Sequence, residues 1–268
     1  MIDDVIAEAR RLGWTRWIRP ASLRDICLRV LRSYEHRAIV ATAWGLRFYL
    51  DPMSDLGEGF IEHGGYEPWT RRTIAEELRP GGVFIDLGAH EGVFSCLASS
   101  IVGPAGRVVA VEPQLRLADI FHINCALNRL ENCRLISKAL SDQPAAILHL
   151  WPRSNSGASS LVNPYAWGAV RRSVETMSFP ALLETCQLSR VDLVKIDVEG
   201  YEKEVIDSMQ PAIAAGQVRV MLVDYHASIL RRRGISANDI HARLLAAGML
   251  HTGWHEQPFE GYGIYRRA

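Results

Sequence analysis

The chain has 268 residues, 48% of them hydrophobic, which is enough for one core with a small appendage. Its 30 basic side chains balance 30 acidic ones, and this neutral charge argues against nucleic acid as a partner. No apolar stretch approaches the roughly 18 residues of a membrane span, and residues 1–19 lack the apolar core of a signal peptide. The sequence therefore predicts a cytoplasmic protein with no membrane partner. The five cysteines form no CxxC pair, and reduced thiols are expected.

Residues 1–44 are predicted to form a helical extension at the N-terminus. Apolar residues recur at helical spacing in residues 2–9 and 23–31, and Ser22 is suited to cap the second helix. We expect a cap packed over one edge of the core; the alternative is a face that binds a partner or a second copy of the chain. The rest of the chain, residues 45–268, is predicted to be one domain.

A short strand at residues 45–51 is followed by a glycine-rich loop, residues 57–68, and by a helix over residues 69–78. The glycines beside Tyr66 and Glu67 favour a loop that folds over a ligand. An ordinary surface connection fits the spacing equally well.

Residues 82–113 predict the central unit of the domain. The apolar run Val83–Leu87 is typical of a buried strand, and it leads through a glycine turn into a helix over residues 93–102. A second apolar strand, residues 108–111, ends at Glu112. Ligands of parallel sheets bind beyond the carboxyl ends of the strands, where glycines allow close approach to the backbone. We therefore expect a nucleoside cofactor whose ribose hydroxyls bind Glu112.

The turn between strand and helix indicates which cofactor is bound. Its spacing, Gly88-x-x-x-Gly92, is not the GxGxxG that a pyrophosphate requires. Asp86 stands just before the turn, where its carboxylate would repel a pyrophosphate but suits a cation. S-adenosylmethionine carries a sulfonium and an ammonium and no phosphate. The alternative is a Rossmann-like domain in which the turn only allows tight packing.

The next elements add polar groups at the same edge of the sheet. A helix over residues 115–127 precedes a strand over residues 133–140, which ends at Ser141 and Asp142. These two side chains are candidates to meet an adenine edge, and a turn cap is the alternative. The serine-rich residues 152–163 are predicted to form a flap near the substrate.

The second informative stretch is an apolar strand that contains Lys195 and ends in several acids. Alternation places Lys195 and Asp197 on one face of this strand. An unpaired lysine inside a strand is costly, so we expect Asp197 or Glu199 as its partner. A purely structural ion pair is the alternative. The next strand, residues 218–223, is followed by His226, a titratable group at the same edge of the sheet.

Two segments of the sequence together resemble the FkbM-type methyltransferase family. They are FIDLGAHEG at residues 84–92 and VDLVKIDVEGYEKEV at residues 191–205, and the shorter segments GGYEP, VEP and SGASSL accompany them. The resemblance covers residues 45–230. It implies a class I, Rossmann-like α/β fold, with a mostly parallel seven-stranded sheet, an antiparallel C-terminal edge strand and helices on both faces. It also implies S-adenosylmethionine as cofactor and S-adenosylhomocysteine as product.

The resemblance assigns roles to individual residues. Those expected around the cofactor are Tyr66, Glu67, Asp86, Gly88, Ala89, His90, Gly92, Glu112, Pro113, Ser141 and Asp142. Those expected to be catalytic are Lys195, Asp197, Glu199 and His226. His90 departs from the family, which often has Asn at that position, so its role is open.

The implied reaction is transfer of the sulfonium methyl group to a hydroxyl oxygen of a sugar or a secondary metabolite. An alcohol loses its proton as it attacks, so a general base is needed, and Asp197, Glu199 and His226 are the candidates. Lys195 would orient Asp197 or stabilise the developing oxyanion. The expected partner is a small hydroxylated molecule, since the neutral charge gives RNA no support.

Other interpretations stay open at this point. Asp197 and Asp224 end strands that should be adjacent, and such carboxylates can hold Mg²⁺; a third oxygen ligand does not directly follow Asp224, so no metal is expected. The fold also suits a nucleotide-dependent oxidoreductase, against which the missing GxGxxG argues, or a cofactor-binding scaffold without activity. The sequence does not decide between a monomer and a homodimer.

Overall fold

The computed structural model describes residues 37–268, apart from residues 52–53, 55, 58, 61–65, 142–144, 151–169 and 256–257. The predictions for residues 1–36, for Asp142 and for the flap at residues 152–163 therefore lie outside the described residues. Within the described ranges, no helix is both long and apolar enough to cross a membrane.

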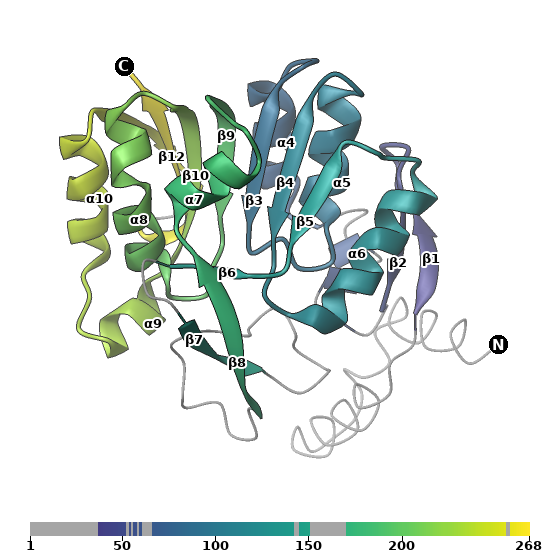
Figure 1. The fold of residues 1–268 in the computed structure, drawn as a ribbon, viewed down its shortest axis with the longest axis horizontal. Coiled ribbons are helices and arrows are strands. Elements are labelled where there is room, and N and C mark those ends of the chain that lie inside the picture. The colour runs from purple at the N-terminus through teal and green to yellow at the C-terminus, as the bar shows by residue number, and fades with distance from the viewer. Residues whose placement is uncertain are drawn as a thin grey trace, which may run out of the picture.

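A seven-stranded sheet with the order β11-β12-β10-β9-β3-β4-β5 forms the centre of the molecule (Figure 1). Its strands are β3 (Val83–Leu87), β4 (Arg107–Val111), β5 (Cys133–Ile136), β9 (Val191–Ile196), β10 (Val218–His226), β11 (Met249–Trp254) and β12 (Glu260–Arg267). Neighbouring strands from β10 to β5 are parallel, whereas β12 is antiparallel to both β10 and β11. The predicted mostly parallel seven-stranded sheet is confirmed.

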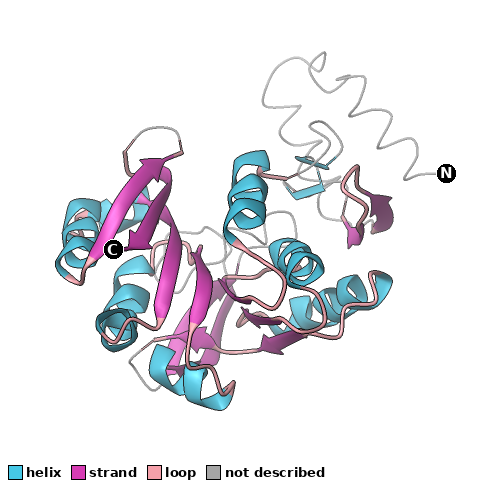
Figure 2. Ribbon diagram, turned by 90° about the horizontal axis from the view of Figure 1, so that it is seen from above, coloured by secondary structure: helices cyan, strands magenta, loops and turns pink. Residues whose placement is uncertain are grey.

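Helices cover both faces of this sheet (Figure 2). On one face lie α4 (Pro68–Glu77), α5 (Val93–Val102) and α6 (Leu115–Leu127). On the other lie α7 (Phe179–Thr185), α8 (Glu202–Ala214), α9 (Ala227–Arg232) and α10 (Ala237–Ala246). Each helix of the central crossover units begins after the carboxyl end of a strand, so the loops that could hold a ligand meet at one edge.

Alternation along the strands divides the apolar side chains between two hydrophobic clusters. In β3, Phe84 packs in the cluster that contains Phe121 of α6, whereas Ile85 and Leu87 pack in the cluster that contains Leu182 of α7. Both clusters are fully covered, which fixes the register of β3 because a slip of one residue would exchange its two faces. The loops at the strand ends are thus held on a rigid support.

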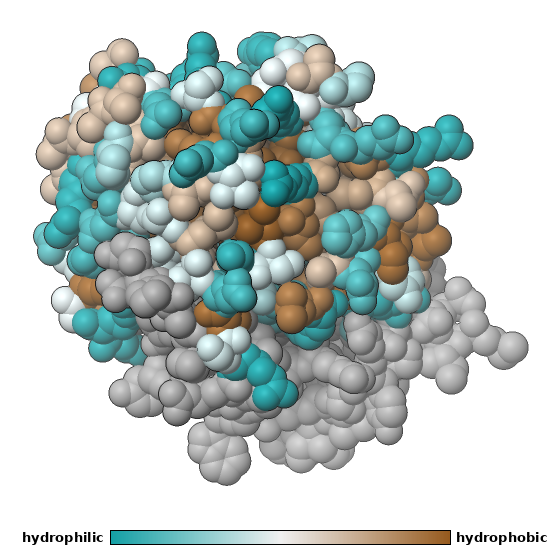
Figure 3. Space-filling view, viewed as in Figure 1, coloured by the Kyte–Doolittle hydropathy of each residue, from teal (hydrophilic) through white to brown (hydrophobic). Residues whose placement is uncertain are grey.

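Two smaller sheets flank the central one. β1 (Ala38–Ala41) and β2 (Arg47–Leu50) form an antiparallel pair. β8 (Val170–Met177) pairs with β6 (Ala139–Leu140) and with β7 (Ala145–Leu150). On the face seen in Figure 3, hydrophobic residues are interspersed with hydrophilic ones.

The structure corrects three boundaries that the sequence predicted. Residues 38–41 are a strand and not helical, because they pair with β2. The predicted strand at residues 133–140 is split, because β5 pairs with β4 and β6 pairs with β8. β10 continues to His226, because β12 pairs with its last residues. The predicted antiparallel C-terminal edge is confirmed, because β11 and β12 form an antiparallel pair and β11 is the edge strand.

Candidate active site

The turn between β3 and α5 holds its backbone against two neighbouring elements. Gly88 has φ of +81°, and a Cβ atom on it would lie 1.8 Å from the carbonyl oxygen of Asp197. Gly92 has φ of +83°, and a Cβ atom there would lie 2.5 Å from the ring of Phe121. Only glycine fits either position. The turn is therefore in direct contact with the end of β9, where the acids of the second motif lie.

Glu112 follows β4 and is oriented by the backbone around it. Its carboxylate is buried and accepts the N–H of His90 at 3.0 Å and the N–H of Gln114 at 2.9 Å. Burial raises the pKa of Glu112 to about 7, although both hydrogen bonds favour the charged form. The glycine turn and Glu112, both assigned to the cofactor by the sequence, are thus in contact through His90.

The buried Lys195 links β9 to β3. Its ammonium donates to Oδ2 of Asp197 at 2.9 Å and lies 3.9 Å from Oδ1 of Asp86, its register partner in β3. Of the two partners predicted for Lys195, Asp197 and Glu199, the structure shows Asp197. Ser95 donates to Oδ2 of Asp86 at 2.6 Å. Burial alone would lower the pKa of Lys195, but the carboxylates of Asp197 and Asp86 raise it above its usual value.

Two aromatic rings complete the surroundings of this ammonium group. Nζ of Lys195 lies 5.1 Å from the ring centre of Phe94 and 6.0 Å from that of Tyr262. The hydroxyl of Tyr262 donates to Oδ2 of Asp197 at 3.4 Å. Tyr262 comes from β12, and its pairing with Asp224 of β10 brings it to this edge. Nothing in the local sequence pattern marked either aromatic residue as part of the site.

Tyr66 and Glu67 lie at the start of α4, on the side of the site that Phe94 lines. The ring of Tyr66 lies 6.0 Å from that of Phe94, and Glu67 accepts a hydrogen bond from the hydroxyl of Thr70 at 2.8 Å. Burial raises the pKa of Glu67, and the charge of Lys195 acts against this rise. Both residues therefore lie beside the cluster around Lys195.

His226 at the end of β10 lies among three carboxylates. Its Nδ1 lies 2.6 Å from Oε1 of Glu202, and its Nε2 lies 3.5 Å from Oε2 of Glu199 and 3.8 Å from Oδ1 of Asp197. Burial alone would lower the pKa of His226, but Glu199 and Glu202 raise it well above its usual value. Burial would raise the pKa of Asp197, but Lys195 and His226 lower it. The four predicted catalytic residues thus form one cluster.

Two further acids belong to this cluster although the sequence assigned them no role of this kind. Glu202 is fully buried, accepts the N–H of Gly200 at 2.9 Å and orients His226. Burial raises the pKa of Asp224 to about 7, and the charge of Asp197 adds to the rise. In the sequence, only their position near the acid-rich ends of the strands indicated that Glu202 and Asp224 could belong to the site.

The remaining cofactor candidates occupy less direct positions. Ala89 and Pro113 flank the turn and the end of β4, and the N–H of Ala89 donates to the carbonyl of Val111 at 3.1 Å. Burial lowers the pKa of His90. Ser141 directly follows β6, and its hydroxyl lies 3.0 Å from that of Tyr201, the residue before α8.

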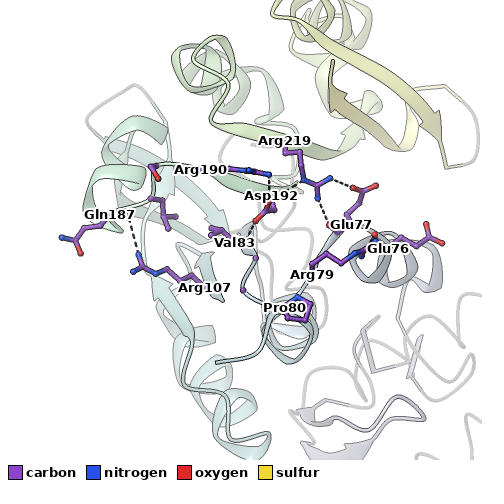
Figure 4. Close-up of a pocket in the computed structure, with 14 residues that line it drawn as sticks. Glu76, Glu77, Arg79, Pro80, Val83, Arg107, Gln187, Arg190, Asp192 and Arg219 are labelled. Atoms are coloured by element: carbon purple, nitrogen blue, oxygen red, sulfur yellow. Dashed lines mark hydrogen bonds and ion pairs between the residues drawn. The ribbon is translucent and has the colours of Figure 1, made fainter. Parts of the chain in front are cut away.

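A cavity of about 890 Å³ lies at the opposite, amino ends of the strands (Figure 4). Its charged residues bind one another: Arg219 binds Glu77 at 2.9 Å, and Arg190 binds Asp192 at 3.3 Å. None of the predicted site residues lines it. We therefore assign this cavity a structural role and place the candidate active site at the carboxyl ends.

The family model described as the methyltransferase FkbM domain matches residues 86–250, from the strand before the glycine turn to the start of β11. The chain belongs to this family. The resemblance recognised in the two sequence motifs is thereby confirmed. The match contains Asp86, Glu112 and the whole cluster around His226.

The individual proteins that the chain resembles share less than a third of its residues. The hexuronic acid methyltransferase AglP of Haloferax volcanii is 28% identical over 193 residues, which are 68% of each chain. Among solved structures, fibrillarin of Aeropyrum pernix with natively bound S-adenosyl-L-methionine is 18% identical, with 70% of this chain and 67% of that chain covered and a TM-score of 0.43. Precorrin-6y C5,15-methyltransferase of Geobacter metallireducens is 16% identical, with coverage of 74% and 88% and a TM-score of 0.42.

Proposed function

We propose that this member of the FkbM family is an S-adenosylmethionine-dependent methyltransferase that methylates a hydroxyl oxygen of a sugar or a related metabolite. The observation that carries the proposal is the contact between the glycine turn at Gly88 and the backbone of Asp197. This contact joins a turn suited to a nucleoside cofactor directly to a cluster of acids suited to proton transfer. Family membership and the curated hexuronic acid methyltransferase support the reaction type.

The residues around the turn fit a cationic cofactor with a ribose. Oδ1 of Asp86 is buried without a hydrogen-bond partner among the described residues, although Lys195 lies 3.9 Å away. Three carboxyl groups, those of Asp86, Glu67 and Asp197, lie around the single positive charge of Lys195. Burial raises the pKa of Asp86 and of Glu67, and a bound cation would favour their ionised forms and the resulting excess of negative charge. A sulfonium and an ammonium group would balance that excess. Glu112, held by two backbone N–H groups, is the carboxylate available to ribose hydroxyls.

The acid cluster fits an alcohol as methyl acceptor. When bound, S-adenosylmethionine supplies a methyl group on a sulfonium whose electron pair stays on sulfur as the C–S bond breaks. The acceptor hydroxyl must lose its proton while its O–C bond forms, which calls for a base within reach. Asp197 and Glu199 both face Nε2 of His226, so a hydroxyl in this gap would meet a carboxylate on either side. Lys195 positions Asp197 through its 2.9 Å bond.

The charge of the cluster favours a hydroxyl over a carboxylate acceptor. A hexuronic acid offers both groups, and a carboxylate would need no base. The carboxyl groups of Asp197, Glu199, Glu202 and Asp224 gather at this end of the strands, where Lys195 and His226 supply two positive charges. The two cations are already paired with these acids, so they are not available to bind an anionic acceptor. A neutral hydroxyl enters such a site at lower electrostatic cost and makes use of its bases.

Calorimetric titration with S-adenosylmethionine and S-adenosylhomocysteine tests the proposal. We expect micromolar binding of both ligands and a loss of about tenfold or more in Glu112→Ala, since that variant lacks the carboxylate that takes the ribose. Glu131→Ala, which changes an exposed glutamate, is the matched control and should bind as the wild type does. Folded wild-type protein that binds neither ligand would contradict the proposal, and an unchanged affinity in Glu112→Ala would contradict the role of Glu112.

A further inference from the structure

The side chains of Asp197, Glu199 and His226 converge on one point at the carboxyl ends of β9 and β10. One ligand atom from each residue lies within 4.8 Å of the others. Nε2 of His226 is 3.5 Å from Oε2 of Glu199 and 3.8 Å from Oδ1 of Asp197. Ligands bound about 2.1 Å from a small divalent cation lie about 3.0 to 4.2 Å apart, so a slight contraction would bring these atoms into coordination distance.

Two of these three side chains are already oriented as ligands by groups behind them. Nδ1 of His226 contacts the fully buried Glu202 at 2.6 Å, and Glu202 is itself fixed by the N–H of Gly200 at 2.9 Å. This contact directs Nε2 toward the carboxylates. A carboxylate behind a histidine ring is the usual support of a metal-binding histidine.

Asp197 is supported in the same way. Its Oδ2 is bound by the ammonium of Lys195 at 2.9 Å and by the hydroxyl of Tyr262 at 3.4 Å. Its Oδ1 is the oxygen that faces His226. Oδ2 of Asp197 thus binds the surrounding protein, and Oδ1 faces the point between His226 and Glu199. Hydrogen-bonded carboxylate ligands of metal ions use their two oxygens in this way.

From this arrangement we infer that Asp197, Glu199 and His226 form a binding site for a divalent cation of the Mn²⁺ or Mg²⁺ type. Two carboxylates and one imidazole are a donor set that Mn²⁺ accepts. Three protein ligands leave positions open in a six-coordinate ion, and an acceptor hydroxyl can occupy one of them. This set differs from the pair Asp197 and Asp224 considered from the sequence, and it supplies the third ligand that the pair lacked.

Binding of the cation does not depend on the proposed function, whereas its task of holding an acceptor hydroxyl does. In the cation-bound state Asp197 and Glu199 act as ligands and not as the general base. The two states therefore predict different effects of chelation on turnover, but the existence of the site is tested by binding alone.

The test is a titration of metal-free protein with Mn²⁺, in which the electron paramagnetic resonance signal measures the concentration of free ion. We expect one site per chain with a dissociation constant in the micromolar range, and competition by Mg²⁺. Glu199→Gln and His226→Asn should each weaken binding about tenfold or more. Glu184→Gln, a change of an exposed glutamate in α7, is the control and should leave binding unchanged.

Thermal unfolding of each variant without metal shows whether the variant is folded. If His226→Asn is not folded, Glu199→Gln alone tests the site. Absence of Mn²⁺ binding by the wild type, or equal binding by the wild type and Glu199→Gln, would overturn the inference. Titration with S-adenosylmethionine separates it from the proposed function. Mn²⁺ binding without cofactor binding would support the cation site and contradict the methyltransferase proposal. Cofactor binding without Mn²⁺ binding would support the methyltransferase proposal and contradict the cation site.

Discussion

The carboxylate of Glu112 is 5% exposed and accepts two backbone hydrogen bonds, yet burial raises its pKa from 4.5 to about 7. The folded chain therefore holds this proton more tightly than the unfolded chain does. Protonated Glu112 therefore stabilises the folded state at pH values below its pKa in the unfolded chain. This contribution to the free energy of unfolding is lost as the pH rises through the pKa of Glu112 in the folded protein. The residue that we propose to bind the cofactor ribose thus contributes less to the stability of the folded protein as the pH rises toward 7.

This leads to a prediction for Glu112→Gln, which removes the titration and preserves the shape of the side chain. Relative to this variant, the wild-type free energy of unfolding should fall by as much as about 3 kcal/mol between pH 4.5 and pH 7. Urea unfolding of both proteins at several pH values, without ligand, measures the difference. Parallel pH profiles would show that the pKa of Glu112 is the same in the folded and in the unfolded protein.

At the scale of elements, β3 and β9 are joined by a buried charge pair as well as by their backbones. Asp86 and Lys195 are register partners, and Lys195 also binds Asp197. Removal of one partner of a buried ion pair leaves an uncompensated charge and costs about 3–5 kcal/mol. We expect a loss of this size for Lys195→Met in urea unfolding at neutral pH.

Two further variants distinguish this loss from a general effect of deleting a lysine. Lys203→Met removes the partly exposed pair with Asp207 on α8 and should cost less than about 1 kcal/mol. Asp86→Asn should restore part of the stability of Lys195→Met, because it removes one of the carboxylates left without a cation. If the double variant is no more stable than Lys195→Met, the loss does not arise from the charge of Asp86.

The sequence predicted those parts of the fold and site that depend on neighbouring residues. The unit β3–turn–α5–β4 follows from periodicity and glycine spacing. An acidic partner for Lys195, either Asp197 or Glu199, follows from the cost of a buried lysine. Tyr262 could not be predicted, because it reaches Asp197 only through the pairing of β12 with β10. The split between β5 and β6 has the same cause, since distant partners decide where each strand ends.

Individual site residues show the same division. Gly88 was identifiable from its place in the turn, but its contact with the carbonyl of Asp197 is a feature of the assembled sheet. Glu202 stood among the acids quoted from the second motif, and only the structure shows that it orients His226. Composition and spacing therefore indicate the chemistry available at the site, whereas the non-local pairing determines which atoms face each other.

On the scale of the whole molecule, the two ends of the parallel sheet have different tasks. The candidate active site lies beyond the carboxyl ends, and the charged cavity of Figure 4 lies at the amino ends. Asp192 and Asp197, at the two ends of β9, are separated by about 16 Å of extended chain. At the amino ends, Glu77 of α4 binds Arg219 of β10 and Arg266 of β12.

We expect Glu77→Gln to reduce the free energy of unfolding by about 1–3 kcal/mol, because both arginines lose a charge-assisted hydrogen-bond partner. The affinities for S-adenosylmethionine and for Mn²⁺ should stay within about twofold of the wild-type values, since no group at the carboxyl ends changes its charge or contacts. Urea unfolding and the two binding titrations measure these quantities on the same preparation. A large loss of either affinity in folded Glu77→Gln would mean that the two ends of the sheet are coupled. The connecting element would be α4, because its N-cap residue Glu67 lies beside the site and Glu77 is its last residue.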